Sequence, residues 1–203
     1  MWVDQNAFGF LIVYFDVEED EYALEREAFV ERFEEFRRAV YDFVAGRSPG
    51  AGVRGLDLGH GIYFELESGD ETVDPFVWAR ELRAALGEAG FVTAATITHG
   101  SRWAPEAEAP SAHTQLVGTA EVTAWSRPSE PLRKALYADT ATRPDADGEG
   151  GWGPGLYVDT EAVEALGRTP KNAPTIARVG ASALFEWTAS GSPSARSHAC
   201  RSS

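Results

Sequence analysis

Three polar residues stand at points where predicted strands end or turn, and they are the first candidates for chemistry. Asp16 closes an apolar run, His60 is the middle residue of the triplet Gly59-His60-Gly61, and His99 follows a second apolar run. Carboxylates and imidazoles both bind divalent cations, and both also occur as ordinary residues in turns and at strand ends. The residue types alone leave these two interpretations open at each position.

The strands that hold these residues are predicted from local patterns. Residues 8–15 form a continuous apolar run rich in β-branched and aromatic side chains, which is typical of a strand buried on both faces. Asp16 ends that strand. Short strands over residues 53–58 and 62–67 flank Gly59-His60-Gly61, and a tight glycine turn between two strands predicts a β-hairpin.

Two helices and a fourth strand complete the predicted core. Asp74-Pro75 is a start signal for one helix, which Gly90 ends. Residues 91–98 predict a strand that ends at His99. A longer amphipathic helix is predicted over residues 23–44 from apolar residues at helical spacing, namely Phe29, Phe33, Phe36, Val40 and Phe43.

The order of these elements is strand, helix, strand, strand, helix, strand. This βαββαβ order predicts a ferredoxin-like core of the α/β (α+β) class, in which an antiparallel sheet carries both crossover helices on one face. In such a sheet the first strand and the hairpin are spatial neighbours. We therefore expect Asp16 and the Gly59-His60-Gly61 turn to meet at one edge.

Beyond this core the patterns are shorter, and we expect a C-terminal extension of the same domain. We predict a single domain over residues 1–189 and a disordered, low-complexity tail over residues 190–203. The extension is expected to hold a helix over 114–125, a mobile linker over 143–155, a strand over 155–158, a helix over 160–166 capped by Asp159 or Thr160, and an edge strand over 183–187.

Composition restricts the partners and the compartment. The formal net charge of the 203 residues is −14 at pH 7, and Cys200 is the only cysteine. An acidic surface repels phosphate backbones, so we expect no nucleic-acid partner, although a bound divalent metal would reverse the local charge for a nucleoside triphosphate. A lone cysteine excludes an intrachain disulfide, and no apolar stretch is long enough to span a membrane. We predict a cytoplasmic protein without a membrane partner.

Four short motifs follow one another in an informative order. Their order and spacing resemble the catalytic domain of class III nucleotide cyclases, including bacterial cyclases that make pyrimidine cyclic nucleotides in phage defence. The resemblance extends over roughly residues 8–166. The motifs are Val13-Tyr14-Phe15-Asp16-Val17, Leu58-Gly59-His60-Gly61-Ile62-Tyr63, Ile97-Thr98-His99-Gly100 and Gly118-Thr119-Ala120-Glu121-Val122-Thr123-Ala124.

The resemblance implies conversion of a nucleoside triphosphate to a cyclic nucleotide and pyrophosphate. It assigns Asp16 and His60 to metal binding and catalysis, because they match the positions of the family's two metal aspartates. It assigns Gly61 and Arg102 to contacts with the nucleotide. The implied cofactor is a divalent metal, Mn²⁺ or Mg²⁺, and an imidazole suits Mn²⁺ better than Mg²⁺. The implied partners are the triphosphate and a second copy of the chain, because sites in this family form between two protomers.

Four positions depart from the family pattern. His60 replaces the second metal aspartate, Leu56 stands where adenylate cyclases carry a base-reading lysine, and Val122 and Ser126 replace an asparagine and an arginine. Our first hypothesis is a nucleotide cyclase acting on a nucleoside triphosphate. Pyrimidine cyclases vary at the base-reading positions, so a pyrimidine cyclase in antiviral signalling is one form of this hypothesis. The alternative is a catalytically degenerate cyclase-like module for nucleotide binding or dimerisation. A third hypothesis is an unrelated ferredoxin-like dimeric ligand-binding domain.

Overall fold

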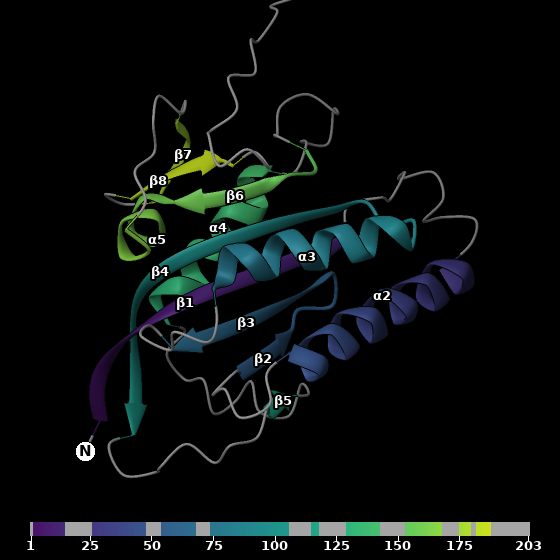
Figure 1. Cartoon of the computed structure of the whole chain (residues 1–203), viewed down its shortest axis with the longest axis horizontal. Helices are drawn as coiled ribbons and strands as arrows, with labels where there is room; N and C mark the ends of the chain where they lie inside the picture. The colour runs from purple at the N-terminus through teal and green to yellow at the C-terminus, as the bar shows by residue number, and fades with distance from the viewer. Residues whose placement is uncertain are drawn as a thin grey trace, which may run out of the picture.

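A computed structural model shows the predicted core and part of the extension (Figure 1). The expectations for Asp16, for residues 118–125, for most of the linker and for the tail concern positions outside the described residues. The structure describes residues 2–14, 26–47, 54–67, 74–105, 115–117, 129–142, 153–167, 175–179 and 182–187.

The centre of the fold is a four-stranded antiparallel sheet within a larger one. β1 (Trp2–Tyr14) pairs with β3 (Gly61–Glu67) on one side and with β4 (Thr93–Pro105) on the other, and β2 (Arg54–Asp57) pairs with the outer edge of β3. All three pairings agree with the predicted ferredoxin-like arrangement. The described strands form one sheet in the order β5-β2-β3-β1-β4-β6-β8-β7.

Two helices cover one face of this sheet, as predicted. They are α2 (Arg26–Arg47) and α3 (Pro75–Glu88), and they lie side by side in front of the sheet in Figure 1. Asp74 caps α3 by accepting hydrogen bonds from the backbone N–H groups of Phe76 at 2.8 Å and Val77 at 3.3 Å. The main core lies between these helices and the sheet, where its aromatic members include Phe8, Phe10, Tyr14, Phe33, Phe36, Phe64, Trp78 and Phe91.

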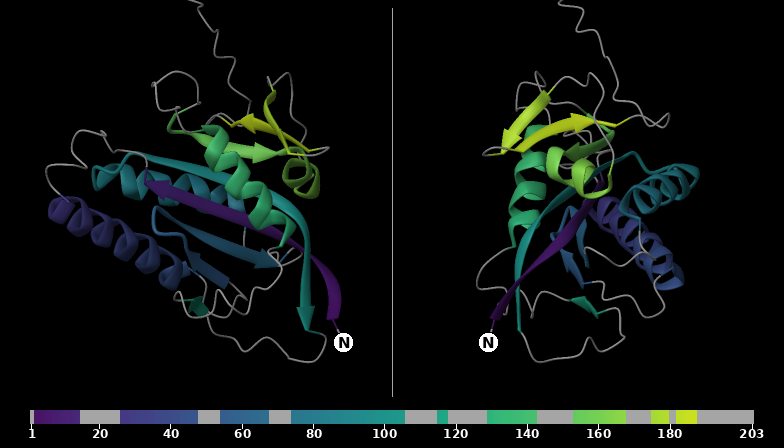
Figure 2. Two further views of the ribbon diagram at one scale, coloured as in Figure 1. Left: turned by 180° about the vertical axis from the view of Figure 1, so that it is seen from behind. Right: turned by 60° about the vertical axis from the view of Figure 1, so that its left-hand side comes forward.

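A further helix, α4 (Glu130–Thr142), lies across the opposite face (Figure 2). The helix expected over residues 114–125 is wrong in its described part, because residues Gln115–Val117 form strand β5, parallel to β2. Ser129 caps α4 by accepting a hydrogen bond from the N–H of Leu132 at 3.3 Å. Pro131 fits in the first turn, where a helix needs no N–H donor from that residue.

The sequence pattern of α4 conceals its buried face. Lys134 and Asp139 are 4% and 7% exposed, whereas Leu136 and Tyr137 are 37% and 51% exposed. A stripe that buries charged residues and exposes apolar ones does not produce the usual amphipathic signal. The buried face of α4 thus mixes charged residues with apolar ones, which explains why the helix was not predicted.

The strand predicted to end at His99 continues to Pro105, so that prediction is wrong. The backbone of the extra residues pairs with the first residues of β1, in the register Ala7↔Gly100 and Gln5↔Arg102. The segment Gly100-Ser101-Arg102 lacks the apolar pattern of the buried strand before it. Its pairing depends on β1, which local pattern alone does not reveal.

The C-terminal elements extend the sheet beyond β4. β6 (Leu156–Asp159) pairs parallel to β4, and α5 (Thr160–Ala165) follows directly, capped by Asp159, which accepts from the N–H of Ala162 at 2.7 Å. Both elements were predicted, and the cap is Asp159, one of the two residues expected there. The expected edge strand is β8 (Ser182–Glu186), and it lies inside the sheet because β7 (Thr175–Val179) pairs with its outer side. None of the described helices is long and apolar enough to cross a membrane.

Gly9 in β1 permits α4 to lie close to the sheet. A Cβ at this position would stand 2.6 Å from Thr98 Oγ1, 2.8 Å from the Tyr63 hydroxyl and 2.9 Å from Pro131 Cβ. We expect Gly9→Ala to lower the free energy of unfolding by about 1–3 kcal/mol, because the added methyl overpacks this contact. Urea denaturation measures the change.

Gly46→Ala is the matched control, because a Cβ there meets nothing within 4 Å and Gly46 is an exposed residue of α2. This control should be neutral or more stable by up to about 1 kcal/mol, since alanine favours a helix. Equal stability of Gly9→Ala and the wild type would contradict the close packing of α4.

Candidate functional site

The predicted hairpin is present, and it lies beside the end of β1. Gly59 has a positive φ of 82°, and the turn is closed by a hydrogen bond from Leu58 N to Gly61 O at 2.9 Å. The backbone N–H of Tyr14 donates to the carbonyl oxygen of His60 at 3.2 Å. The close of β1 and the hairpin turn therefore share one edge. The expectation that Asp16 meets this turn stays a prediction, because Asp16 is outside the described residues.

His60 contacts a carboxylate that the sequence did not indicate. Its Nε2 lies 2.8 Å from Oδ2 of Asp139, a residue of α4 that is 79 positions away. The side chain of Asp139 is 8% exposed and that of His60 is 42% exposed. We call these two residues the His60–Asp139 pair. Because Asp139 engages Nε2, a cation bound to this ring would be bound by Nδ1.

Gly61 and Arg102, the two predicted nucleotide contacts, lie far from each other. Gly61 opens β3 opposite Val13, and a Cβ there would lie 2.7 Å from the carbonyl oxygen of Ile12. Arg102 is buried within β4, with its Nη1 atom 3.8 Å from Oε2 of Glu65. Glu65 is four residues beyond Gly61 along β3, which is about 13 Å of strand. Gly61 therefore lies beside His60, near the end of α4 that carries Asp139, whereas Arg102 lies near the start of α4.

A buried polar cluster surrounds Arg102 at the start of α4. Glu65 is 1% exposed and accepts hydrogen bonds from the hydroxyls of Tyr63, at 3.2 Å, and Ser129. Burial, and then the neighbouring Glu65 carboxylate, raise the pKa of Tyr63 well above its usual value. These contacts join β3 and β4 to the cap of α4, so they fix where the helix begins.

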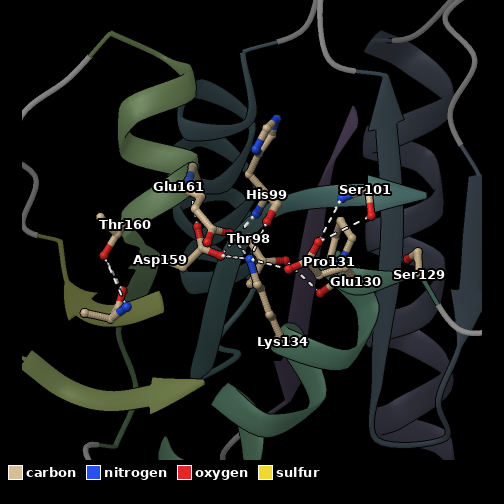
Figure 3. Close-up of polar contacts among 12 residues, drawn as sticks. Thr98, His99, Ser101, Ser129, Glu130, Pro131, Lys134, Asp159, Thr160 and Glu161 are labelled. Carbon is tan, nitrogen blue, oxygen red and sulfur yellow. Dashed lines mark hydrogen bonds and ion pairs between the residues drawn. The ribbon is translucent and has the colours of Figure 1, made fainter. Parts of the chain in front are cut away.

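A second polar cluster centres on Lys134, in the middle of α4 (Figure 3). The Lys134 ammonium donates to the carbonyl oxygen of His99 at 2.8 Å and to the Glu161 carboxylate. It also lies 3.3 Å from Glu130 Oε1 and 3.6 Å from Asp159 Oδ2. We call these residues the Lys134 cluster. It joins α4 to β4, β6 and α5, and sequence reasoning missed it because its members are scattered single charges.

The third sequence candidate, His99, lies within β4 rather than at its end. Its ring centroid is 4.8 Å from that of Phe8, and the backbone N–H of His99 donates to Asp159 Oδ2 at 3.2 Å. Burial, and then the positive charge of Lys134, lower the pKa of His99. This environment favours the neutral imidazole, in keeping with a packed histidine.

Within the described ranges, no three histidine, cysteine, aspartate or glutamate side chains are grouped to hold a metal ion. That finding does not address the predicted ligands, because Asp16 is outside those ranges. The described half of the predicted donor set is one imidazole nitrogen, oriented by a carboxylate. This donor chemistry fits Mn²⁺ better than Mg²⁺, which prefers oxygen ligands.

Comparison with known proteins agrees with this fold. Neither a protein-family model nor a curated protein matches the sequence. The mixed α+β architecture of this chain is similar to the fold of a cyclase among the solved structures. One similar structure is the guanylyl cyclase Cya2, with a TM-score of 0.57 over 90% of this chain and 90% of that chain, at 13% sequence identity. A structural match at so low an identity shows a shared fold and no more. The activity must be argued from the site.

The Asp159 carboxyl provides a test of the Lys134 cluster through pH. Burial raises the pKa of Asp159 from 3.8 to about 6, against the opposing effects of its backbone N–H donors and Lys134. The folded state therefore binds a proton at a higher pH than the unfolded chain does. The contribution of Asp159 to stability is fully present below about pH 4 and is lost as pH rises through 6, by up to about 3 kcal/mol.

Asp159→Asn removes this titration and keeps a residue that can cap α5. We expect the stability difference, wild type minus variant, to grow as pH falls from about 7.5 to about 4.5. Urea denaturation of both proteins across this range measures it. A difference that is constant with pH would contradict the raised pKa.

Proposed function

We propose that this chain is a nucleotide cyclase that converts a nucleoside triphosphate to a cyclic nucleotide and pyrophosphate. The observation that carries the proposal is the hydrogen bond from Tyr14 N to His60 O at 3.2 Å, within a cyclase-like fold. It brings the close of the first strand to the hairpin turn, the two places where the resemblance to class III cyclases implies metal ligands.

Catalysis of this reaction requires that the triphosphate be positioned and that the charge on its phosphate oxygens be neutralised. The 3′ oxygen of the ribose forms a bond to the α-phosphorus, the bond from that phosphorus to the pyrophosphate oxygen breaks, and the 3′ proton leaves to solvent. Little covalent help from the protein is needed in such a phosphoryl transfer. In this proposal Asp16 and His60 hold a divalent cation, which would neutralise the charge that develops on the phosphate oxygens.

The proposal extends to a homodimer. Within one chain, Ser129 contacts Glu65 at the start of α4, while Asp139 contacts His60 toward its end. These two α4 residues are separated by about 15 Å of helix. Ser129, at the start of α4, therefore lies far from the hairpin of its own chain. The proposed dimer itself rests on the resemblance to class III nucleotide cyclases, in which sites form between two protomers.

The proposed substrate is a pyrimidine triphosphate, and the proposed setting is antiviral signalling. Leu56 supports the base preference, because it stands where adenylate cyclases carry a lysine that reads the base. In the structure Leu56 is 5% exposed and packs in the core under α4. A purine-reading contact from this position is therefore not expected.

A degenerate cyclase-like module is the second candidate. The observation that favours it is the His60–Asp139 pair, in which the hairpin side chain is already engaged by a carboxylate of the same chain. A domain of this kind would keep the fold and the dimer interface and would bind nucleotide without turnover.

An assay with each of the four triphosphates and Mn²⁺ or Mg²⁺ tests the enzyme directly. We expect a cyclic product and pyrophosphate, detected by mass spectrometry, with the highest rate for a pyrimidine triphosphate and Mn²⁺. Asp16→Ala should lower the rate by about 100-fold or more, because loss of a metal ligand removes several kcal/mol of charge stabilisation.

Asp42→Ala is the matched control, because Asp42 is an exposed aspartate of α2, and it should retain the full rate. If no triphosphate yields a product, the enzyme proposal is wrong. A thermal shift with triphosphate and Mn²⁺ then separates a nucleotide-binding module from an unrelated domain, since saturation at 100 times Kd adds about 2.7 kcal/mol of stability.

His60→Asp tests whether the hairpin belongs to the site. The new carboxylate would face Asp139, and the repulsion between them should lower the melting temperature in the absence of metal. In the variant the proposed metal ligands would be two carboxylates, that of Asp16 and the new one at position 60, and such a pair suits Mg²⁺. We therefore expect Mg²⁺ to raise the melting temperature of the variant and to create or increase turnover.

His60→Asn is the neutral control, and it should show neither Mg²⁺ effect. A His60→Asp protein whose melting temperature and turnover ignore Mg²⁺ would exclude the hairpin from the metal site.

A further inference from the structure

The contact between α4 and the hairpin has the geometry of a device that orients a histidine. Asp139 Oδ2 lies 2.8 Å from His60 Nε2. A carboxylate accepts hydrogen bonds and donates none, so the proton of a neutral His60 ring resides on Nε2. The lone pair is then on Nδ1. A histidine that binds a metal commonly donates its other ring N–H to a carboxylate in this way.

The two side chains of the pair differ in exposure, as they must if Asp139 orients His60 toward a ligand. The side chain of Asp139 is 8% exposed, whereas that of His60 is 42% exposed. A ligand from solvent therefore reaches the imidazole more readily than it reaches the carboxylate. The carboxylate acts on such a ligand through His60.

The helix that carries Asp139 is held firmly against the sheet. Leu132, Ala135 and Ala138 are at most 4% exposed on the face that packs against β1 and β4. The hydroxyl of Thr98 donates to the carbonyl oxygen of Pro131 at 2.8 Å, and Lys134 anchors the next turn. Asp139 is thus presented to the hairpin by a rigid element, which is what precise orientation of a second side chain needs.

We propose that Asp139 is a positioning residue that fixes the His60 tautomer, so that Nδ1 is the nitrogen presented to a divalent cation. This inference rests on the proposed function and adds a residue that the hairpin motif does not contain. A hydrogen bond that only ties α4 to the hairpin would produce the same contact. A test must therefore read the tautomer and the cation, and not stability alone.

Asp139→Asn is the informative variant, because it keeps the side-chain size while an amide can donate to Nε2 and stabilise the opposite tautomer. Nitrogen NMR of the protein without metal or nucleotide, at about pH 8.5, where an ordinary imidazole is neutral, reports which ring nitrogen carries the proton. His60→Ala assigns the signals among the four histidines of the chain. We expect proton on Nε2 in the wild type and a shift toward Nδ1 in Asp139→Asn.

Mn²⁺ affinity, measured by electron paramagnetic resonance without nucleotide, provides the second readout. We expect Asp139→Asn to weaken binding by about 10- to 100-fold, and to have no effect in a His60→Ala background. Asp139→Ala removes the acceptor without offering a donor and should also weaken binding. Asp42→Asn, an exposed change of the same type on α2, should leave both the tautomer and the affinity unchanged.

Several results would overturn the inference. They are a wild-type ring protonated on Nδ1, a tautomer that ignores both Asp139 variants, an Mn²⁺ affinity that ignores Asp139→Asn, and a wild-type protein that does not bind Mn²⁺. A protein that shows the tautomer and affinity changes but forms no cyclic nucleotide would overturn the proposed function and retain this inference.

Discussion

The absence of a side chain at Gly9 lets Pro131 and the rest of α4 approach the middle strand of the sheet. Thr98, Tyr63 and Pro131 all lie within 2.9 Å of the place where a Cβ would stand. Successive turns of α4 then bring Ser129 to Glu65, Lys134 to the carbonyl oxygen of His99, and Asp139 to His60. The polar contacts of this face therefore depend on one helix being close to the sheet along its whole length.

The charged side chains beneath α4 are stable only because they lie close enough to pair with one another. Burying an ammonium or a carboxylate costs several kcal/mol unless partners replace the lost water. Lys134, which is 4% exposed, meets Glu130, Asp159, Glu161 and a backbone carbonyl. With three carboxylates around one ammonium, acidic groups are in excess. The raised pKa of Asp159 follows from its burial in this setting.

Local signals in the sequence predicted much of the fold. The apolar run of β1, the Gly59-His60-Gly61 turn and the Asp74 cap each depend on neighbouring residues, and all three are present. The solved structure of a guanylyl cyclase with a similar fold agrees with the predicted core. The extension of β4 past His99 was missed because it depends on pairing with β1, almost a hundred residues earlier in the chain.

The candidate site was less predictable for the same reason. The hairpin places His60, but its partner Asp139 is 79 residues away on a helix whose buried face carries charge. No spacing rule links those two positions. Lys134 and Asp159 are likewise unremarkable in sequence and meet only in the folded chain. The roles of Asp16, Gly61 and Arg102 toward metal and nucleotide stay predictions.

The topology of β1 also has a consequence for how the chain is assembled during synthesis. β1 is made before both of its neighbours in the sheet, because β3 and β4 begin only at Gly61 and Thr93. Residues 7–14 are apolar and buried in the native state, with the side chains 0–8% exposed. This strand therefore stays unpaired until its neighbours have been synthesised. Pairings of such long sequence separation form slowly because loop closure precedes them. During synthesis the chain thus exposes an apolar, aggregation-prone segment before the partners of that segment exist.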